Sequence, residues 1–320
     1  MEDRVTSRDG EAADAGVGSA PGDPVSMPRR AFLLVSAAAG VFAATARAQR
    51  ASSPFSFRRV RRSFLDSRYG QLHVRTVAPD IPTAAPPVVC LHQAPLSGRM
   101  FTRFLGEMGR DRSAMAPDLP GYGESDPPPQ PPEAADYADA VVDLVERLGS
   151  AHADVLGIQA GAAVAAELAI RYPKKIRRVV LCSVPLYTKE RRDALLASLK
   201  PGPATEDGAH LMRLWQGALA GRGPGQTLEQ IDSAVADRLR AGERENWAFQ
   251  SMFRWDGFTR LPLVTQPTLV LRPKDLLWEP TAGASPLMKS ARPVDLPDMG
   301  NGLFEVDPAR LANLVRSFLF

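Results

Sequence analysis

The residue types that most often carry out chemistry in enzymes are sparse in this chain of 320 residues. It contains four histidines and two cysteines. Two cysteines exclude a thiolate zinc cluster and a disulfide-rich scaffold. The sequence has no His-x-x-x-His pair, its carboxylates are scattered, and no glycine-rich loop has phosphate-binding spacing. We therefore expect no metal site and no cofactor.

The elements that would position a site alternate along the chain after residue 58. Apolar and β-branched runs predict strands at 58–66, 70–77, 87–92, 114–117, 153–157, 178–182, 267–271 and 293–296. Helical spacing of apolar residues predicts helices at 99–109, 133–148, 160–172 and 308–318. The first two strands form a hairpin around Arg68-Tyr69-Gly70. The repeated strand–helix unit after them predicts a parallel sheet wrapped by helices.

Residues 185–258 interrupt this alternation. They contain helical patterns but no convincing strand, and Thr227-Leu228-Glu229-Gln230 is a capping box. An aromatic and methionine cluster follows between Trp247 and Trp255. Such a cluster is more typical of core packing than of a ligand cage, although an insertion over a sheet can also line a pocket. Upstream, Arg58, Arg59, Arg61 and Arg62 are either a phosphate-binding patch or the solvated face of an edge hairpin, and we favour the second interpretation.

From about residue 60 to the end, the sequence resembles the α/β-hydrolases that carry a helical cap. The segments that carry the resemblance are Leu91-His92-Gln93-Ala94-Pro95, Asp118 to Asp126, Gly157-Ile158-Gln159-Ala160-Gly161, Pro273-Lys274-Asp275 and Gly300-Asn301-Gly302. They match, in chain order, the His-Gly turn, the Asp-x-x-Gly-x-Gly-x-Ser-Asp loop, the nucleophile elbow, the acid and the base of that family. The resemblance implies a mostly parallel eight-stranded sheet flanked by helices over residues 60–320, with a helical cap at about 185–258.

The same resemblance assigns the site residues and shows which ones lack the family's usual chemistry. It places Gln159 at the nucleophile position, Asn301 at the base position and Asp275 at the acid position. A carboxamide cannot form an acyl-enzyme, and asparagine cannot accept a proton near neutral pH. Asp275 alone retains its type, and we expect it to hydrogen-bond Asn301, which would in turn bond Gln159.

The oxyanion-hole N–H groups require no particular side chain. By family analogy they belong to Gln93 and Ala160, and they would bind a carbonyl or carboxylate oxygen. His92 lies on the same turn, where its usual role is to hold the loop. We expect structural roles for it and for the other histidines, His73, His152 and His210.

Two classes of function follow. One is a non-hydrolytic protein that keeps the pocket and binds a small molecule. The other is a hydrolase of a small ester, amide or C–C bond substrate that works through a non-standard site, for example water activated by Asp275. The absence of both the nucleophile and the base favours the first class. The fold suggests a hydrolase, but fold alone does not establish function. The sequence identifies neither the ligand nor the oligomeric state.

The N-terminal segment has the pattern of an export signal. Residues 1–26 are polar and aperiodic, which predicts disorder. Arg29 and Arg30 precede an uncharged run to Ala46, and Ala46-Arg47-Ala48 is a small-x-small cleavage site. Residues 27–48 thus resemble a bacterial twin-arginine signal, with Met27 as an alternative start. The uncharged run is short for a membrane span, so we expect cleavage near Gln49 and a periplasmic or secreted protein rather than a membrane anchor.

Charge and cysteine content narrow the partners. The formal net charge is +3. Residues 1–48 carry 5 basic and 6 acidic residues, so the chain after them has 34 − 30 = +4. This bias is too weak to favour nucleic acid or an anionic membrane surface. The predicted fold places Cys90 and Cys182 in strands that are not neighbours, so we expect two buried free thiols.

Overall fold

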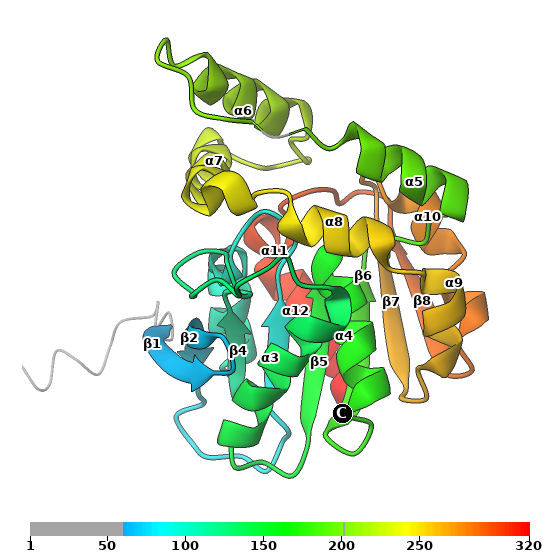
Figure 1. Cartoon of the computed structure of the whole chain (residues 1–320). Helices are drawn as coiled ribbons and strands as arrows, with labels where there is room; N and C mark the ends of the chain where they lie inside the picture. Colours follow the sequence, from blue (N-terminus) through cyan, green and yellow to red (C-terminus); the bar gives the residue numbers. More distant parts are fainter. Residues whose placement is uncertain (1–59, 201) are drawn as a thin grey trace, which may run out of the picture. The chain divides into compact units, whose positions relative to one another are not determined.

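The eight strands form a single sheet in the computed structural model, which describes residues 60–200 and 202–320. The strand order is β1-β2-β4-β3-β5-β6-β7-β8 (Figure 1). The strands are β1 (Arg61–Ser67), β2 (Gly70–Val77), β3 (Val88–Leu91), β4 (Ala114–Pro117), β5 (Ala153–Ile158), β6 (Ile176–Cys182), β7 (Thr268–Pro273) and β8 (Ala291–Leu296). Strand β2 pairs antiparallel with both β1 and β4, and all the other pairs are parallel. The predicted fold class is confirmed.

Helices cover both faces of this sheet. The helices of the core are α2 (Thr102–Met108), α3 (Ala134–Arg147), α4 (Ala160–Arg171), α10 (Trp278–Ala282), α11 (Leu303–Val306) and α12 (Pro308–Leu319). Helices α3 and α4 pack on one face, and α2, α11 and α12 pack on the other. The sequence of β3 is continuously apolar because both faces of this strand are covered by helices. Val89 and Leu91 face the layer of α3 and α4, and Val88 and Cys90 face the layer of α2, α11 and α12.

The predicted elements agree with the structure to within about three residues at each end. One difference concerns the helix predicted at 99–109. Its first turn is the 3₁₀ helix η2 (Gly98–Phe101), and α2 begins only at Thr102. The hydroxyl of Ser97 accepts a hydrogen bond from the N–H of Arg99, which caps this tighter turn.

A group of helices lies between β6 and β7. They are α5 (Lys189–Ser198), α6 (Ala209–Ala220), α7 (Leu228–Ala241), α8 (Trp247–Arg254) and α9 (Gly257–Arg260), with the short turns η3 (Gly242–Arg244) and η4 (Leu261–Leu263). Two shorter features, η5 (Ser285–Leu287) and α10, precede β8. The predicted capping box at the start of α7 is present. Figure 1 shows α5–α8 lying over one end of the sheet.

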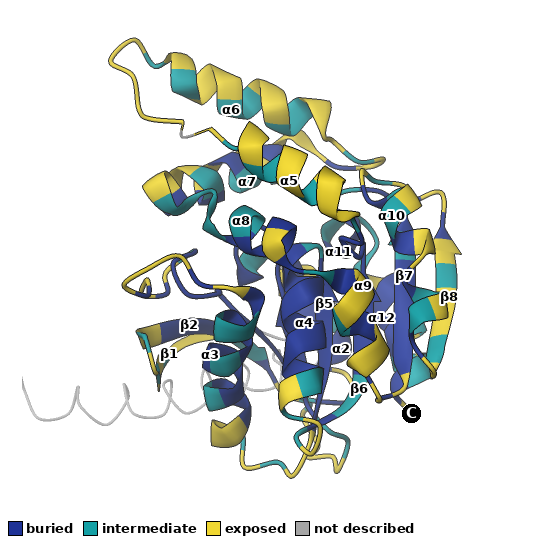
Figure 2. Cartoon of the chain, turned by 45° about the vertical axis from the view of Figure 1, so that its right-hand side comes forward, coloured by how far each residue is buried: buried dark blue, intermediate teal, exposed yellow. Residues whose placement is uncertain are grey.

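The aromatic cluster of this insertion belongs to the core. Met252, Phe253 and Trp255 are buried in the same hydrophobic cluster as α3 and α4. Figure 2 shows that most of α4 is buried. The indole N–H of Trp255 donates to Glu167 of α4 at 2.9 Å, and Arg260 binds the same carboxylate through two hydrogen bonds of 2.7 Å. These contacts join the insertion to the core, as the core-packing interpretation predicted.

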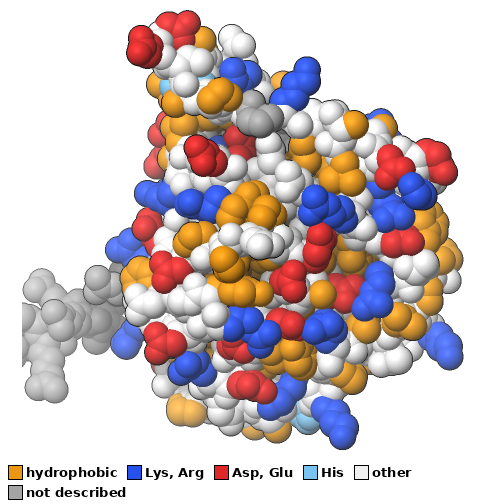
Figure 3. Space-filling model, viewed as in Figure 1, with side chains coloured by type: hydrophobic (Ala, Val, Ile, Leu, Met, Phe, Trp, Pro, Cys, Tyr) orange, Lys and Arg blue, Asp and Glu red, His pale blue; other side chains and the backbone are white. Residues whose placement is uncertain are grey.

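Both cysteines are free and fully buried, as expected. Cys90 lies in β3 and Cys182 in β6, and β5 separates these strands. On the face shown in Figure 3, basic and acidic side chains are interspersed rather than segregated. Within the described residues, no helix is both long and apolar enough to cross a membrane. The predicted disordered segment (1–26) and export signal (27–48) lie outside the described residues.

Candidate functional site

Three neighbouring strands each deliver one polar residue to the same edge of the sheet. Gln159 follows β5, Ser183 follows β6, and Asp275 lies two residues after β7. These strands are parallel and adjacent, so their carboxyl ends meet. In open α/β sheets this edge is where ligands bind.

Gln159 occupies a strained turn between β5 and α4. Its φ of 53° and ψ of −115° are unusual for a residue with a side chain, and such conformations cost about 1–3 kcal/mol. Two glycines make the turn possible. A Cβ at Gly157 would lie 2.0 Å from the carbonyl oxygen of Gly161, and a Cβ at Gly161 would lie 2.2 Å from that of Leu91. The sequence thus forms a sharp elbow that presents residue 159 at the edge of the sheet.

Asp275 receives two hydrogen bonds. The hydroxyl of Ser183 donates to Oδ2 at 2.6 Å, and the backbone N–H of Leu277 donates to Oδ1 at 2.8 Å. Burial raises the pKa of Asp275 above its ordinary value, although these donors and the nearby side chain of Gln159 oppose the shift. The carboxyl is therefore fixed in place by groups that only donate to it.

Ser183 was not among the predicted site residues. It is fully buried, and its φ of 52° makes it, with Gln159, one of two described non-glycine residues with positive φ. The available signal was its position. A polar residue directly after β6 lies at the same sheet edge as the residues that follow β5 and β7.

Asn301 differs from the expected arrangement. Its Nδ2 donates to the carbonyl oxygen of Gly221 in the helical insertion, at 2.7 Å. A Cβ at Gly223 would lie 2.0 Å from the carbonyl oxygen of Asn301, so the two loops are in close contact. The expected hydrogen bonds from Asp275 to Asn301 and from Asn301 to Gln159 are not formed. Asp275 accepts from Ser183 and Leu277, and Asn301 instead joins the loop after β8 to the insertion.

His92 is held in its turn by two hydrogen bonds. Its Nε2 accepts a hydrogen bond of 2.8 Å from the N–H of Leu119, so its proton is on Nδ1, which donates to the carbonyl oxygen of Gln93 at 3.0 Å. Burial lowers the pKa of His92, which favours this neutral form. The Oε1 of Gln93 is buried without a hydrogen-bond partner among the described residues. Ala160 is the first residue of α4, so its N–H is not used within the helix.

All four histidines of the chain lie in the described part, and each has partners away from Asp275. His73 bonds Asp118 at 2.9 Å, His152 bonds the carbonyl oxygen of Lys174, and His210 bonds Thr205. Among residues 60–200 and 202–320, no group of three or more His, Cys, Asp or Glu side chains could hold a metal ion. The site thus offers hydrogen-bond donors and one half-buried carboxyl.

Comparison with known proteins supports the architecture. A family model described as the alpha/beta hydrolase fold matches residues 86–271, which is more than half of the chain. The 2-(acetamidomethylene)succinate hydrolase of Mesorhizobium japonicum is 32% identical over 138 residues, which cover 43% of this chain and 46% of that protein. The 2-hydroxymuconate semialdehyde hydrolase of a Pseudomonas species is 36% identical over 76 residues, which cover 23% of this chain and 27% of that protein.

These alignments span less than half the length of either curated relative. Among solved structures, a thermophilic esterase from Thermogutta terrifontis superposes with a TM-score of 0.65 at 22% identity, and the match covers 81% of this chain and 98% of the esterase. At this identity the likeness concerns the fold alone.

Proposed function

Because the chain belongs to the alpha/beta hydrolase fold family, we propose that it binds a small molecule at the elbow without forming an acyl-enzyme. One observation carries the proposal. Gln159 occupies the elbow near Asp275, and every histidine of the chain is engaged elsewhere. A carboxamide in this place supplies neither a nucleophile nor a general base.

The ligand is a compound with a carbonyl or carboxylate oxygen. The backbone N–H groups of Gln93 and Ala160 are the donors that would face such an oxygen. The buried Oε1 of Gln93 is a spare acceptor on the same turn, and a hydroxyl or amide N–H of the ligand would satisfy it. These groups bind and orient a small polar molecule, and none of them attacks it.

A pair of variants tests the absence of covalent chemistry. Wild-type protein should show no burst with a nitrophenyl ester and no labelling by a fluorophosphonate. Gln159→Ser alone should remain nearly inactive, because no base activates the hydroxyl. Gln159→Ser with Asn301→His supplies a serine and a histidine at the sheet edge, and we expect weak esterase activity from this double variant only. The activity requires the new histidine to turn from the Gly221 carbonyl, which Asn301 contacts, toward Asp275. The oxyanion hole and binding alone leave about 10³–10⁴-fold over water in serine hydrolases that lack a triad member.

The hydrolase alternative has its own signature. Stoichiometric fluorophosphonate labelling of the wild type would identify a nucleophile outside the elbow and overturn the proposal. Ester hydrolysis by the wild type that Asp275→Ala abolishes would favour water activated by Asp275. Native mass spectrometry of the purified protein tests binding directly, because a co-purified small molecule should be retained by the wild type and lost from a Gln159→Trp variant that fills the site.

We also propose that the protein is exported through residues 27–48. The support is the pair Arg29-Arg30, the apolar run after it and the site Ala46-Arg47-Ala48. Cell fractionation should find a mature chain that begins near Gln49 in the periplasm. Replacing both Arg29 and Arg30 by lysine should retain the full-length chain inside the cell. Equal export of this variant and the wild type would contradict the twin-arginine assignment.

A further inference from the structure

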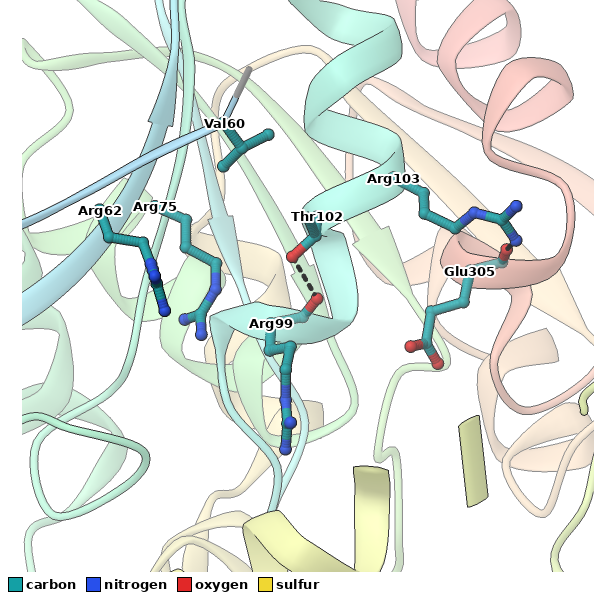
Figure 4. A pocket seen from close by; sticks show the side chains of 7 residues that line it. All are labelled: Val60, Arg62, Arg75, Arg99, Thr102, Arg103 and Glu305. Atoms are coloured by element: carbon teal, nitrogen blue, oxygen red, sulfur yellow. Dashed lines mark hydrogen bonds between the residues drawn. The ribbon is translucent and has the colours of Figure 1, made fainter. Parts of the chain in front are cut away.

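A cavity of about 370 Å³, away from the elbow, is lined by four arginines and one glutamate, together with Val60 and Thr102. Arg62 and Arg75 come from the β1–β2 hairpin, Arg99 and Arg103 come from η2 and α2, and Glu305 comes from α11. Figure 4 shows the side chains of Arg62, Arg75 and Arg99 on one side of the cavity and the carboxylate of Glu305 on the other. The volume is within the usual range of small-molecule sites. None of the elbow residues lines it.

The two hairpin arginines lie side by side on neighbouring strands. Arg62 and Arg75 are direct partners in the antiparallel register of β1 and β2, so their side chains project from the same face. Like charges directly opposite each other destabilise a strand pair. Burial lowers the pKa of Arg75, although the charges of Asp118 and Asp237 oppose the shift. The positive charges of Arg99 and Arg62 lower this pKa further, which reflects the repulsion between the arginines. A solvated hairpin face does not need two arginines in direct register, so the repulsion between Arg62 and Arg75 calls for another explanation.

The carboxylates of Asp118 and Asp237, which also lie near these arginines, are already engaged. Asp118 accepts hydrogen bonds from the N–H groups of Gly98 and Glu124, and from the side chains of His73 and Arg75. Its four lone-pair positions are thus matched by four donors. Asp237 of α7 accepts from Ser97 at 2.9 Å and from Arg99 at 2.5 Å.

The guanidinium groups still have free donors. Arg75 uses only Nη1, and Arg99 uses only its Nη2, in side-chain hydrogen bonds with described residues. Arg62 has no carboxylate within ion-pair distance in the described part of the chain. A guanidinium carries five N–H donors. Arg103 is turned aside and donates to the backbone carbonyl oxygen of Glu305 at 2.8 Å (Figure 4).

We propose that this cavity binds a compact oxyanion, a phosphoryl or carboxylate group, on Arg62, Arg75 and Arg99. Planar guanidinium groups match the geometry of such oxyanions and hold them through paired hydrogen bonds. The ligand would relieve the repulsion across the hairpin. Arg62, which as part of a basic run was expected to be solvated, therefore has a specific role.

Glu305 makes the affinity depend on pH. Burial raises its pKa to about 7, although Arg99 and Arg103 oppose the shift, and Asp237 adds to it. On α12, the other helix packed on α11, Arg310 pairs with Asp298 and Arg316 pairs with Asp111. Below pH 7 the carboxyl is mostly neutral and the cavity is more positive. Above it, the carboxylate repels an oxyanion, so binding weakens as the pH rises.

The experiment is a calorimetric titration of the full chain with sulfate, which remains a dianion throughout this pH range. We expect saturable binding at one site at pH 6 and weaker binding at pH 8. Arg62→Gln should reduce the affinity roughly tenfold or more, as expected for the loss of charge-assisted hydrogen bonds. Arg61→Gln is the matched control. It removes the same charge one residue earlier, on the opposite face of the strand, and it should change the affinity by less than about twofold.

Glu305→Gln provides the second readout. This variant should bind sulfate at pH 8 about as well as the wild type does at pH 6, and its affinity should vary little between these values. Parallel titrations with inorganic phosphate and with acetate identify which oxyanion is preferred. The proposal is overturned if no saturable binding occurs at pH 6, or if Arg61→Gln and Arg62→Gln weaken binding equally.

Discussion

Asp275 is a half-buried carboxyl that accepts hydrogen bonds from Ser183 and Leu277, and this pattern makes Ser183 a positioning residue. Ser183→Ala removes the 2.6 Å hydrogen bond to Oδ2. Loss of a hydrogen bond to a charged group should lower the free energy of unfolding by about 1.5–3 kcal/mol. Ser183→Gly removes the same hydrogen bond, but glycine tolerates the φ of 52°. The decrease in its free energy of unfolding should therefore be about 1 kcal/mol smaller than that of Ser183→Ala. Urea unfolding measures both.

The stability lost in Ser183→Ala should depend on pH, because the pKa of Asp275 is shifted in the folded state. The folded-state pKa of Asp275 is raised, so ionisation of this group costs stability as the pH rises through that value. Ser183 reduces the cost by donating to the ionised form. The difference between the wild type and Ser183→Ala should therefore be larger at pH 7 than at pH 4. An equal difference at both values would mean that Asp275 is not the partner that matters.

Asp118 titrates in the opposite sense. Burial alone would raise its pKa, but the hydrogen bond from His73, the charge of Arg75 and the N–H of Glu124 outweigh burial and hold the pKa below its ordinary value. Its stabilisation is present above about pH 4 and is lost as the pH falls through the folded pKa. Asp118→Asn places an amide among four donors and should cost about 3–5 kcal/mol. In urea unfolding, the difference in free energy of unfolding between the wild type and this variant should be constant above about pH 5 and should narrow as the pH falls below about 4.

Among the elements, the elbow depends most on glycine. Gly161→Ala places a methyl group against the carbonyl oxygen of Leu91, and overpacking of this kind costs about 1–3 kcal/mol or more. Gly217→Ala is the control, because Gly217 is exposed in α6 and a Cβ there meets nothing closer than 4.0 Å. The control should be neutral or slightly stabilising, since alanine favours a helix. Thermal melts should separate the two variants, and equal melting temperatures would show that the elbow relaxes.

The local patterns of the sequence were enough to predict the sheet and most helices. Val88 to Leu91 and the apolar spacing in α3 are periodicities that burial imposes directly. The elbow at Gln159 was predicted because Gly157 and Gly161, two residues to either side of it, indicate that backbone segments lie very close together there. The role of Asn301 was not predictable, because its partner, Gly221, is 80 residues away in an insertion with no repeating pattern. Ser183 was missed because a lone serine carries no spacing signal.

At the scale of the whole molecule, the two buried thiols link the fold to the expected compartment. Burial raises the pKa of both Cys90 and Cys182 well above the ordinary value of a thiol, and the thiolate is the reactive form. Native protein purified without a reductant should not react with a maleimide, and denatured protein should react twice. A mass two units below that of the reduced chain would indicate a disulfide, which strands β3 and β6 do not allow.

The placement of the helical insertion has a consequence for the order in which the chain assembles. Residues 183–267, a run of 85, separate the paired strands β6 and β7. Closing a flexible loop of that length costs roughly 4 kcal/mol of chain entropy, and pairings between distant segments slow folding. We therefore expect strands β1 to β6 to associate before β7 pairs with β6. Asp275 would then reach Ser183 in a late kinetic step, and the ligand site would be the last part of the sheet edge to form.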